Sequence, residues 1–439
     1  MHPPIKRFEI SGLFGDRNVS LEFPSNVAII VDPNGSGKTT FMRALVCILK
    51  RRWFQLSEIY FDVARIDFHN GETLELHRSE IVDVTEEFPV HNRLRQHFTM
   101  KTIHRLRNVL RHEGSRSRQI TKAAREVGVP SEYLHEMLMG GHQQSILDDE
   151  SSEDPFEEYE EVLARSFPLE VVYFPTYRRV ERALGNDEDE DTWDDMSIHF
   201  GMHDVRNRID RITSQIRESF FNSYSKTNGQ MLTQLIEGIH VEESDIDELA
   251  NSEYIEIVLG RLGDNMNAED KGKLLELIRT RQIEQQRFHP LVYFVNNLMS
   301  VYRQQREKDN AIKQFADVVN EHYLTDKKLE YDESRLTLQM WSRRSNRPVK
   351  LQHLSSGEKQ IVSIFSRLYL TDDESYAIFF DEPELSLSIE WQQQLLADIY
   401  KSRSCKFLFA ATHSPFVYEN ELDEFATSLL TNYTESNNE

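Results

Sequence analysis

The chain has 439 residues, a length that allows two or three domains or one domain with large insertions. Its formal charge of −23, from 74 acidic and 51 basic residues, argues against nucleic-acid binding by the average surface unless basic residues gather in one place. The two cysteines, Cys47 and Cys405, stand in or beside apolar segments, which argues against a disulfide framework and for core positions in a reducing cytosol. Because no signal core and no run of roughly 18 apolar residues is present, we expect a soluble cytoplasmic protein without membrane contact.

Residues 28–40 predict a strand, a glycine-containing loop and the start of a helix. The apolar, β-branched run at 28–31 is typical of a buried strand, and two further strand patterns precede it at 5–10 and 19–23. Beyond the loop, apolar residues at helical spacing predict a buried helix face at Phe41, Leu45, Ile48 and Leu49. An ordinary turn before a helix would also look like this, but the spacing GSGKTT fits a loop that cradles phosphates.

A phosphate-binding loop gives its residues distinct chemical roles. Gly35 and Gly37 let backbone N–H groups face an anion. Lys38 reaches the outer phosphates of ATP, and the Thr39 hydroxyl is placed for Mg²⁺. Asp32 stands where the full pattern has glycine, so its carboxylate would bring negative charge near the phosphates and weaken or slow nucleotide turnover. The candidate nucleotide-binding residues here are Asn34, Gly35, Ser36, Gly37, Lys38, Thr39 and Thr40.

A β-hairpin is expected after the first helix. Residues 61–68 and 73–76 have strand patterns and flank the sequence HNGE. Asn-Gly between alternating segments is the strongest short-range hairpin signal, so these two strands should pair antiparallel.

Positive charge gathers in residues 91–128, which hold ten Lys or Arg and two Glu. Within and just beyond this segment, QITKAAREVGVPSEYL has the small-residue helix, glycine turn and second helix start of a helix-turn-helix. Helical hairpins with a glycine turn are common, however, and Phe98 is the only Phe, Tyr or Trp in 91–128 that could stack on a base. The segment therefore suits a solvated face, an acidic protein or nucleic acid.

Charge then reverses, and the chain alternates between strand and helix patterns. Residues 148–161 and 187–195 hold nine and seven acidic residues and predict solvated loops. Between them, residues 169–174 predict a buried strand that delivers Arg178 and Arg179 beyond its carboxyl end. Helical periodicity from residue 202 to 220, at 274–286 and at 291–319 predicts a compact helical insertion, and strand patterns at 328–330 and 335–341 indicate that the sheet resumes.

Three later motifs can complete a nucleotide site. Residues 354–360, LSSGEKQ, open an apolar helix with a serine-rich start, which suits either an anion or an ordinary capping box closed by Glu358. A buried strand at 376–380 is followed by Asp381 and Glu382. Asp381 can hold Mg²⁺ through water, and Glu382 can polarise the attacking water as general base. Another buried strand at 407–411 delivers His413, which can contact the γ-phosphate.

The order of these motifs resembles the ABC-type ATPases of the SMC, RecF and overcoming-lysogenization branch, over residues 5–80 and 330–420. LSSGEKQ is similar to the family signature, with Ser356 in place of its first glycine, and FFDEPELSLS to the Walker B motif and D-loop. ATHSP is similar to the switch-histidine segment, and YFPTYRR to a Q-loop in which Arg178 or Arg179 replaces glutamine. The resemblance implies ATP and Mg²⁺ as cofactors, Glu382 and His413 as catalytic residues, Thr39 and Asp381 as metal ligands, and further nucleotide contacts from Ser355, Ser356, Gly357 and Glu358.

The resemblance also implies partners. ATP would be sandwiched between two protomers, the phosphate loop of one facing the signature of the other, in a homo-oligomer. The compact insertion looks most like the ATPase subunits of antiphage systems such as PARIS or Septu, whose separate effector is a Toprim or an HNH nuclease. We therefore expect a nucleotide-gated sensor or scaffold, with an acidic trigger protein or nucleic acid at residues 91–128.

The expected fold class is α/β, an ATPase head with helical insertions. Its two lobes would comprise residues 1–85 and 328–439, separated by a helical insertion at 86–165, a Q-loop-like strand with an acidic loop at 166–200, and a second helical insertion at 201–327. A DNA-repair or recombination ATPase and an ATP-bound scaffold with negligible hydrolysis remain open alternatives. A transporter ATPase fits least, because the insertion is larger than such a subunit needs.

Overall fold

The computed structural model describes residues 3–33, 35–87, 117–126, 156–176, 202–237, 241–250, 254–371 and 375–433, with Thr102, Leu106, Val109 and Leu134 as single residues. The chain forms two compact units: unit 1 comprises residues 1–199 and 374–439, and unit 2 comprises residues 200–373. Within the described ranges, none of the helices combines the length and the apolar character that a membrane span requires.

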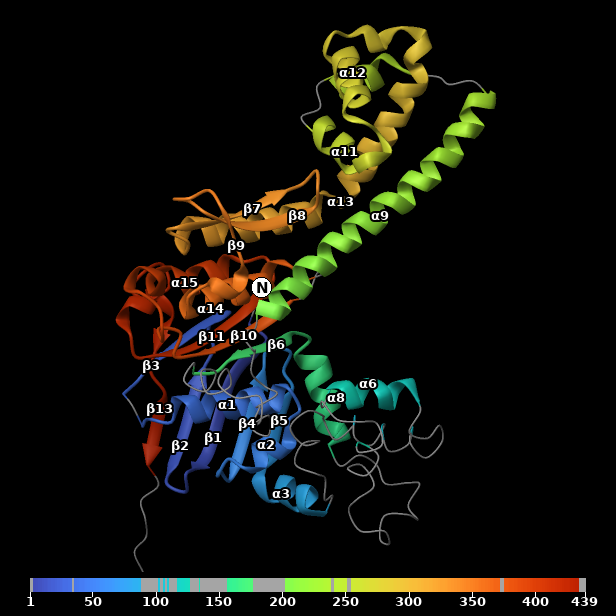
Figure 1. Ribbon diagram of the computed structural model, residues 1–439. Coiled ribbons are helices and arrows are strands. Elements are labelled where there is room, and N and C mark those ends of the chain that lie inside the picture. Colours follow the sequence, from blue (N-terminus) through green and yellow to red (C-terminus); the bar gives the residue numbers. More distant parts are fainter. Residues whose placement is uncertain are drawn as a thin grey trace, which may run out of the picture. The chain divides into compact units, whose positions relative to one another are not determined.

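Unit 1 contains two five-stranded sheets (Figure 1). The antiparallel sheet has the order β13-β2-β1-β4-β5, with bounds Leu430–Tyr433, Arg17–Glu22, Ile5–Leu13, Val63–Phe68 and Thr73–His77. The parallel sheet has the order β12-β3-β11-β10-β6, with bounds Ala426–Thr427, Val27–Val31, Cys405–Thr412, Tyr376–Asp381 and Glu170–Phe174. The α/β class and the antiparallel pairing of β4 with β5 are confirmed.

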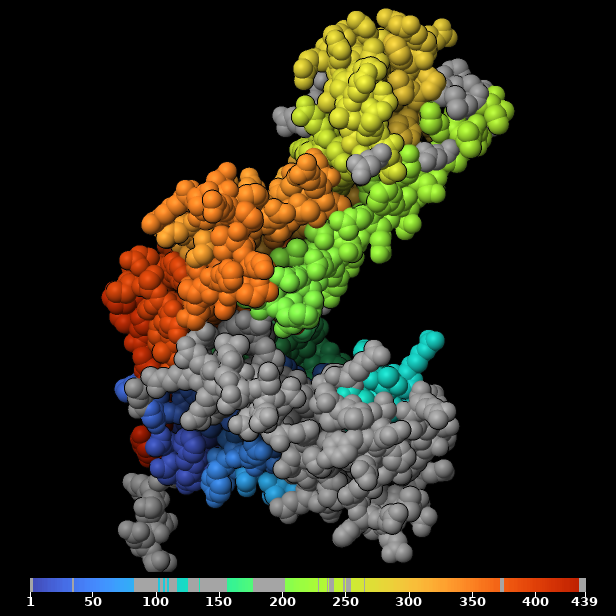
Figure 2. Space-filling view, in the orientation of Figure 1, coloured from blue at the N-terminus to red at the C-terminus, as the bar shows by residue number. Residues whose placement is uncertain are grey.

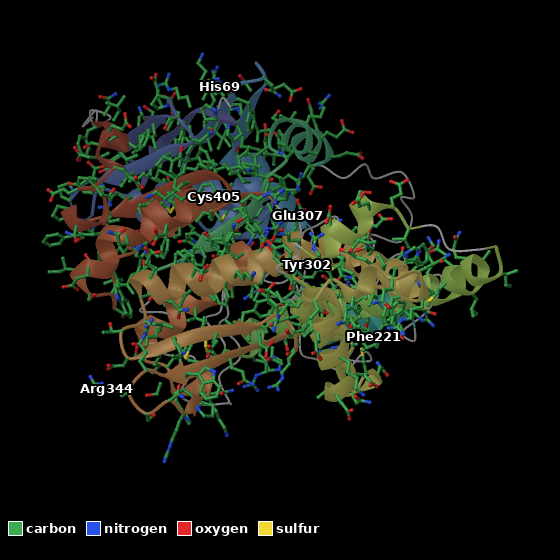
Figure 3. The ribbon with its side chains drawn as sticks, turned by 90° about the horizontal axis from the view of Figure 1, so that it is seen from above. His69, Phe221, Tyr302, Glu307, Arg344 and Cys405 are labelled. Atoms are coloured by element: carbon green, nitrogen blue, oxygen red, sulfur yellow. The ribbon has the colours of Figure 1, made fainter. Side chains whose placement is uncertain are left out.

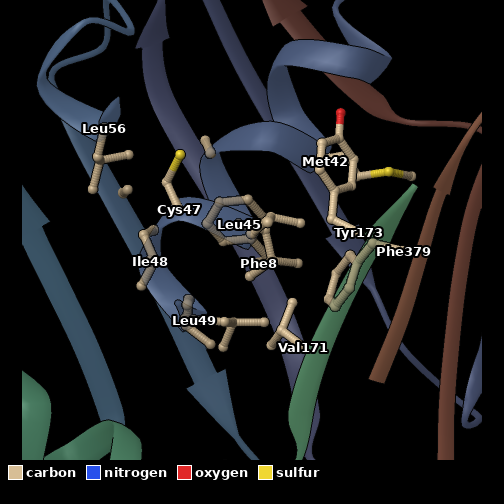
Figure 4. Close-up of a cluster of buried hydrophobic side chains, with 14 of the residues drawn as sticks. Phe8, Met42, Leu45, Cys47, Ile48, Leu49, Leu56, Val171, Tyr173 and Phe379 are labelled. Carbon is tan, nitrogen blue, oxygen red and sulfur yellow. The ribbon is translucent and has the colours of Figure 1, made fainter. Parts of the chain in front are cut away.

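Helix α1 (Lys38–Leu49) lies in one hydrophobic core with both sheets. Its apolar residues recur on both sides of the helix, and nine of its twelve residues are buried. Phe8 from β1, Leu45 from α1 and Phe379 from β10 converge in this core (Figure 4). Burial of side chains of this size is worth roughly 1.5–3 kcal/mol each, so the helix that carries the phosphate loop is firmly held. Cys47 and Cys405 are buried and unpaired with each other, as expected.

The remaining helices in the described part of unit 1 are α2 (Trp53–Ser57), α3 (Arg78–Glu87), α6 (Arg118–Glu126), α8 (Glu157–Ser166) and α15 (Ile389–Lys401), with short 3₁₀ turns at Pro415–Val417 and Asp423–Phe425. The expectation of a solvated acidic loop through residue 161 is wrong for its last part, because Phe156 stacks on Trp53 with ring centroids 5.0 Å apart and α8 begins there. Acidic residues in the first turn of α8 favour the helix through its dipole. Of the expected helix-turn-helix, only its first helix, α6, lies within the described residues, and residues 187–195 lie outside them.

Unit 2 is mainly helical. Its helices are α9 (Met202–Glu237), α10 (Glu243–Ala250), α11 (Ile255–Arg261), α12 (Ala268–Arg279), α13 (His289–His322) and α14 (Ser356–Tyr369), with short 3₁₀ turns at Gly263–Asn265, Gln282–Glu284, Gln286–Phe288 and Leu351–His353. The helix expected at 274–286 ends earlier, at Arg279, because Arg281 adopts a left-handed conformation (φ 56°). Helices α9 and α13 pack against each other, and α9 forms a continuous light-green ridge on the surface (Figure 2).

The strands expected to resume the head sheet do not do so. Strands β7 (Lys327–Asp332), β8 (Thr337–Ser342) and β9 (Pro348–Val349) form a separate three-stranded antiparallel sheet in unit 2. Residues 328–373, grouped with the ATPase lobe from sequence, belong to unit 2 because β7 packs on α13 and α14 packs on α9 and α13. Strand alternation predicts pairing but not the partner sheet.

A buried polar network joins three elements of unit 2. The Arg261 guanidinium at the end of α11 donates to Asp309 on α13 at 2.7 Å, and both side chains are almost fully buried. Tyr331 on β7 also donates to Asp309, at 2.6 Å, and burial followed by the Asp309 charge raises the pKa of this phenol. Tyr302, labelled in Figure 3, lies under the Arg261 guanidinium with its ring centroid at 4.8 Å. A charge pair this deeply buried is costly to break on one side only.

Candidate functional site

The carboxyl ends of four parallel strands bring the candidate residues of unit 1 to one sheet edge. β3 leads into the phosphate loop, β10 ends at Asp381, β11 ends at Thr412 and β6 is followed by Thr176. In register, Phe380 pairs with Phe174 and with Ala410, and Thr412 pairs with Val31. Parallel pairing therefore places these loops together, as expected for a ligand site of an open sheet.

The phosphate loop presents an uncapped helix start. Gly35 and Gly37 have φ of 83° and 95°, a conformation that favours glycine whatever the space around it. No side chain caps the N-terminus of α1, and its first turn holds no acidic residue. Within the described chain the Ser36 hydroxyl oxygen is buried without a hydrogen-bond partner. A helix start without a side-chain cap, beside a buried hydroxyl, fits the oxygens of a phosphate.

Lys38 is held over the loop by backbone carbonyls. Its Nζ donates to the carbonyl oxygen of Asp32 and, at 3.1 Å, to that of Pro33, and it lies 3.0 Å from His413 Nε2. Burial lowers the pKa of Lys38, and the charges of Asp32, Glu382 and other carboxylates act in the opposite direction. The ammonium is thus desolvated beside the place where phosphates would lie, where its charge acts strongly.

A buried carboxylate and two hydroxyls form the candidate metal position. Asp381 is 1% exposed, and it accepts hydrogen bonds from Thr39 Oγ1 at 3.0 Å and Thr176 Oγ1 at 2.7 Å. Burial raises the pKa of Asp381, while the two hydrogen bonds and the Lys38 charge lower it. Hard oxygen donors of this kind suit Mg²⁺, which is commonly completed by water and substrate phosphates. In the described residues no group of three or more His, Cys, Asp or Glu side chains forms another metal site.

The two glutamates after Asp381 have different surroundings. Glu382 has φ of 50°, its backbone N–H donates to Ala411, and its Oε1 lies 4.0 Å from His413 Nε2. Glu384 accepts from the Thr412 hydroxyl and from the His413 backbone N–H, both at 2.8 Å. Glu384 therefore secures the segment that carries His413, whereas Glu382 directs its carboxylate toward the side of the ring that faces Lys38.

Thr176 is the site residue that sequence reasoning missed. The segment YFPTYRR drew attention to Arg178 and Arg179, which lie outside the described residues, as does Asn34. The signal was present, because Thr176 is the first hydroxyl after a buried parallel strand and such loops meet at the ligand edge. Thr40 is half-buried in the first turn of α1.

The signature residues lie in unit 2, at the start of α14. The Ser355 hydroxyl accepts from the Glu358 N–H, and Glu358 accepts in return from the Ser355 N–H at 2.8 Å, so the capping box is confirmed. Glu358 also pairs with Lys327 Nζ at 2.8 Å. Its carboxylate thus stabilises the helix start, with Ser356 and Gly357 forming the first turn.

Comparisons with known proteins identify a family for this chain. A family model described as an AAA ATPase domain matches residues 5–417. Among solved structures, the Smc head domain of Pyrococcus furiosus, with an extended coiled coil and bound to the C-terminal domain of ScpA, is 12% identical with a TM-score of 0.35, over 98% of this chain and 96% of that chain. The Smc head domain of Pyrococcus yayanosii, with a coiled coil and joint, is 15% identical with a TM-score of 0.29, over 95% and 93%. Similarity this low says nothing about substrates, and no curated protein matches the chain.

Proposed function

The chain belongs to the AAA ATPase domain family, and on that premise we propose that its ATPase activity controls a separate effector. ATP would bind with its phosphates at the start of α1, near Lys38 and the Ser36 hydroxyl. Mg²⁺ would be held by Thr39 and, through water, by Asp381, and it would neutralise charge on the phosphates. Glu382 would accept the proton of the attacking water.

The convergence of Lys38, Thr39, Asp381 and His413 at one sheet edge carries the proposal. These residues are up to 375 positions apart in sequence, yet Lys38 lies 3.0 Å from His413, and Thr39 lies 3.0 Å from Asp381. A structural role alone does not explain why a lysine, a histidine and a buried aspartate gather beside an uncapped helix start.

Substitution of Lys38 by Ala is the direct test. Calorimetric titration with ATP and Mg²⁺ should show binding to the parental protein and none to K38A. Lys328→Ala is a matched control, because Lys328 lies on β7 in unit 2, away from the phosphate loop in sequence. Retained affinity in K38A with a normal unfolding curve would overturn the site.

A sandwich dimer follows from the resemblance of residues 354–360 to an ABC signature. Each protomer would supply its phosphate loop to one nucleotide and Ser355, Ser356 and Gly357 to the other. The start of α14 supports this proposal, because helix N-termini favour anions. Light scattering of Glu382→Gln with ATP and Mg²⁺ should show twice the mass of the ligand-free protein, and a constant monomer mass would refute it.

The effector we propose is a separately encoded nuclease of the Toprim or HNH type, in defence against phage. The resemblance to PARIS- and Septu-type ATPases supports this reading. So does the basic segment 91–128, whose ten Lys or Arg contrast with the chain's charge of −23 and suit an acidic trigger. Reversing Arg105, Arg107 and Arg111 to Glu should abolish the response to phage while ATP hydrolysis persists. Unchanged protection would refute the role of this segment.

The same segment favours a second candidate, an ATPase that acts on DNA in repair or recombination. Exposed Arg118 and Lys122 on α6 belong to it. Duplex binding whose affinity falls steeply with salt, and which the three Arg-to-Glu reversals remove, would favour this second function. Duplex binding whose affinity does not change with salt concentration would exclude this second function.

A further inference from the structure

The C-terminal strands cross from one sheet of unit 1 to the other beside the phosphate loop. β12 pairs parallel with β3, placing Ala426 opposite Ile29 and Thr427 opposite Ile30. β13, red in Figure 1, lies beside the blue β2 and pairs antiparallel with it, placing Tyr433 opposite Arg17. The residues between these strands therefore pass directly by the end of β3, where the loop begins.

Asp32 connects this crossing to the loop. Its Oδ2 accepts a hydrogen bond from the backbone N–H of Leu429 at 2.9 Å, and the Ser428 hydroxyl donates to the carbonyl oxygen of Val31 at 3.4 Å. The backbone carbonyl of Asp32 accepts from Lys38 Nζ. Asp32 thus bonds the segment that precedes β13 with its side chain and the candidate phosphate-binding Lys38 with its backbone. Glycine at position 32 would keep the second bond and lose the first.

Arg17 makes a second connection from the same pair of strands. Its Nη1 donates to the carbonyl oxygen of Gly35 at 2.9 Å. Its guanidinium lies 5.8 Å from the ring centroid of Tyr433 and 5.6 Å from that of Phe14. Two residues of the loop are therefore attached to this region: Asp32 to the residue that precedes β13, and Gly35 to Arg17, which pairs with β13.

We propose that Asp32 is a positioning residue, and that its bond to Leu429 lets the segment between β12 and β13 hold the phosphate loop in its ATP-binding conformation. The Asp32 side chain, which replaces the glycine of the usual pattern, then favours ATP binding and does not inhibit it through its charge. The inference rests on the ATP site proposed above. It makes the segment Ala426–Tyr433 a part of the nucleotide site that no sequence motif marks.

Two pairs of variants test the bond from each side. Asp32→Ala removes the acceptor, and Asp32→Asn keeps an acceptor oxygen without the charge. Leu429→Pro removes the N–H, and Leu429→Ala loses side-chain volume but keeps the N–H. Asp32→Ala and Leu429→Pro should each raise the calorimetric dissociation constant of MgATP about five- to tenfold, because one hydrogen bond that holds the loop is lost. The two control variants should show smaller effects, and the double variant Asp32→Ala with Leu429→Pro should bind no more weakly than either single one.

Amide hydrogen exchange of the ligand-free protein provides a readout independent of ATP. Exchange at Leu429 should be faster in Asp32→Ala than in Asp32→Asn, even if Leu429→Pro does not fold. Unchanged exchange at Leu429 would overturn the inference, as would ATP binding to Asp32→Ala that is as tight as, or tighter than, parental. Lys38→Ala separates the two proposals: if it abolishes binding while Asp32→Ala does not weaken it, only the present inference fails. If Lys38→Ala retains binding, the proposed ATP site itself fails.

Discussion

Glu382 and Glu384 can be distinguished as general base and structural residue by replacing each with Gln. Glu384 has both carboxylate oxygens engaged, with Thr412 and with the His413 backbone, each at 2.8 Å. Glu382 Oε1 lies 4.0 Å from His413 Nε2, the ring nitrogen that also lies 3.0 Å from Lys38 Nζ. The sequence Asp-Glu-Pro-Glu contains both glutamates, so we infer which of them is the general base from their surroundings.

The expected magnitudes differ in kind. Removal of a positioned general base lowers kcat by about 10²–10⁴-fold, or about 3–5 kcal/mol of barrier, so Glu382→Gln should hydrolyse ATP at that reduced rate. Its affinity for MgATP should stay within about threefold of parental, because Lys38, Thr39 and Asp381 remain. Glu384→Gln keeps one acceptor and loses the other, which should cost about 1.5–3 kcal/mol of unfolding free energy with a smaller effect on kcat.

Phosphate release at saturating ATP gives kcat, calorimetry gives affinity and thermal unfolding gives stability. Each variant serves as the control for the other, because both remove one carboxylate from the same turn. If Glu382→Gln hydrolyses at the parental rate while Glu384→Gln loses two orders of magnitude, the assignment of the base is reversed. Equal losses in both would mean that neither carboxylate acts alone.

Three further predictions concern buried groups. Asp381→Asn should raise the melting temperature of the ligand-free protein and abolish Mg²⁺-dependent hydrolysis. Burial raises the pKa of this carboxyl above its ordinary value of 3.8, so the stability it contributes is present below that value and lost as pH rises through the folded pKa. The advantage of Asp381→Asn should therefore shrink as pH falls from neutral toward 3.8, and an advantage that does not change with pH would contradict this. Thr176→Val should raise the Mg²⁺ concentration needed for half-maximal hydrolysis more than Thr176→Ser, which keeps the hydroxyl that donates to Asp381. Equal Mg²⁺ titrations of the two variants would show that the Thr176 hydroxyl has no part in the metal site. Arg261→Met should lower the free energy of unfolding by about 3–5 kcal/mol in denaturant melts, because the buried Asp309 carboxylate loses its opposite charge and keeps only the hydrogen bond from Tyr331. Arg261→Met with Asp309→Leu should recover part of the loss.

The parts of the site that sequence predicts are those fixed by local chemistry. Gly35 and Gly37 mark left-handed positions, Lys38 and Thr39 follow at fixed spacing, and the Asn-Gly turn sets the β4–β5 hairpin. These signals act within a few residues, so they can be recognised in the sequence without knowing which strands pair.

The parts that sequence does not predict depend on contacts between distant segments. Thr176 reaches Asp381 across 205 positions because β6 pairs with β10, and no local pattern fixes that strand order. Asp32 looks unfavourable beside phosphates until the segment between β12 and β13 supplies the Leu429 N–H. Strands β7 and β8 alternate as head strands would, but they pair with each other, and β8 pairs with β9 on its other side. Pattern gives each strand its faces, and only the assembled topology gives its neighbours.

Glu382 is the point at which local preference and the complete site disagree most clearly. A glutamate at φ 50° costs of order 1–3 kcal/mol, so the conformation persists only if surrounding structure imposes it. That structure is the β10–β11 register, which directs the Glu382 N–H to the Ala411 carbonyl at 2.8 Å, together with the bonds of Glu384 to the following Thr412 and His413. Glycine would remove the strain and with it the carboxylate. If the Glu382 side chain has a chemical task, the strain is its cost, and Glu382→Gly should then raise stability while lowering kcat.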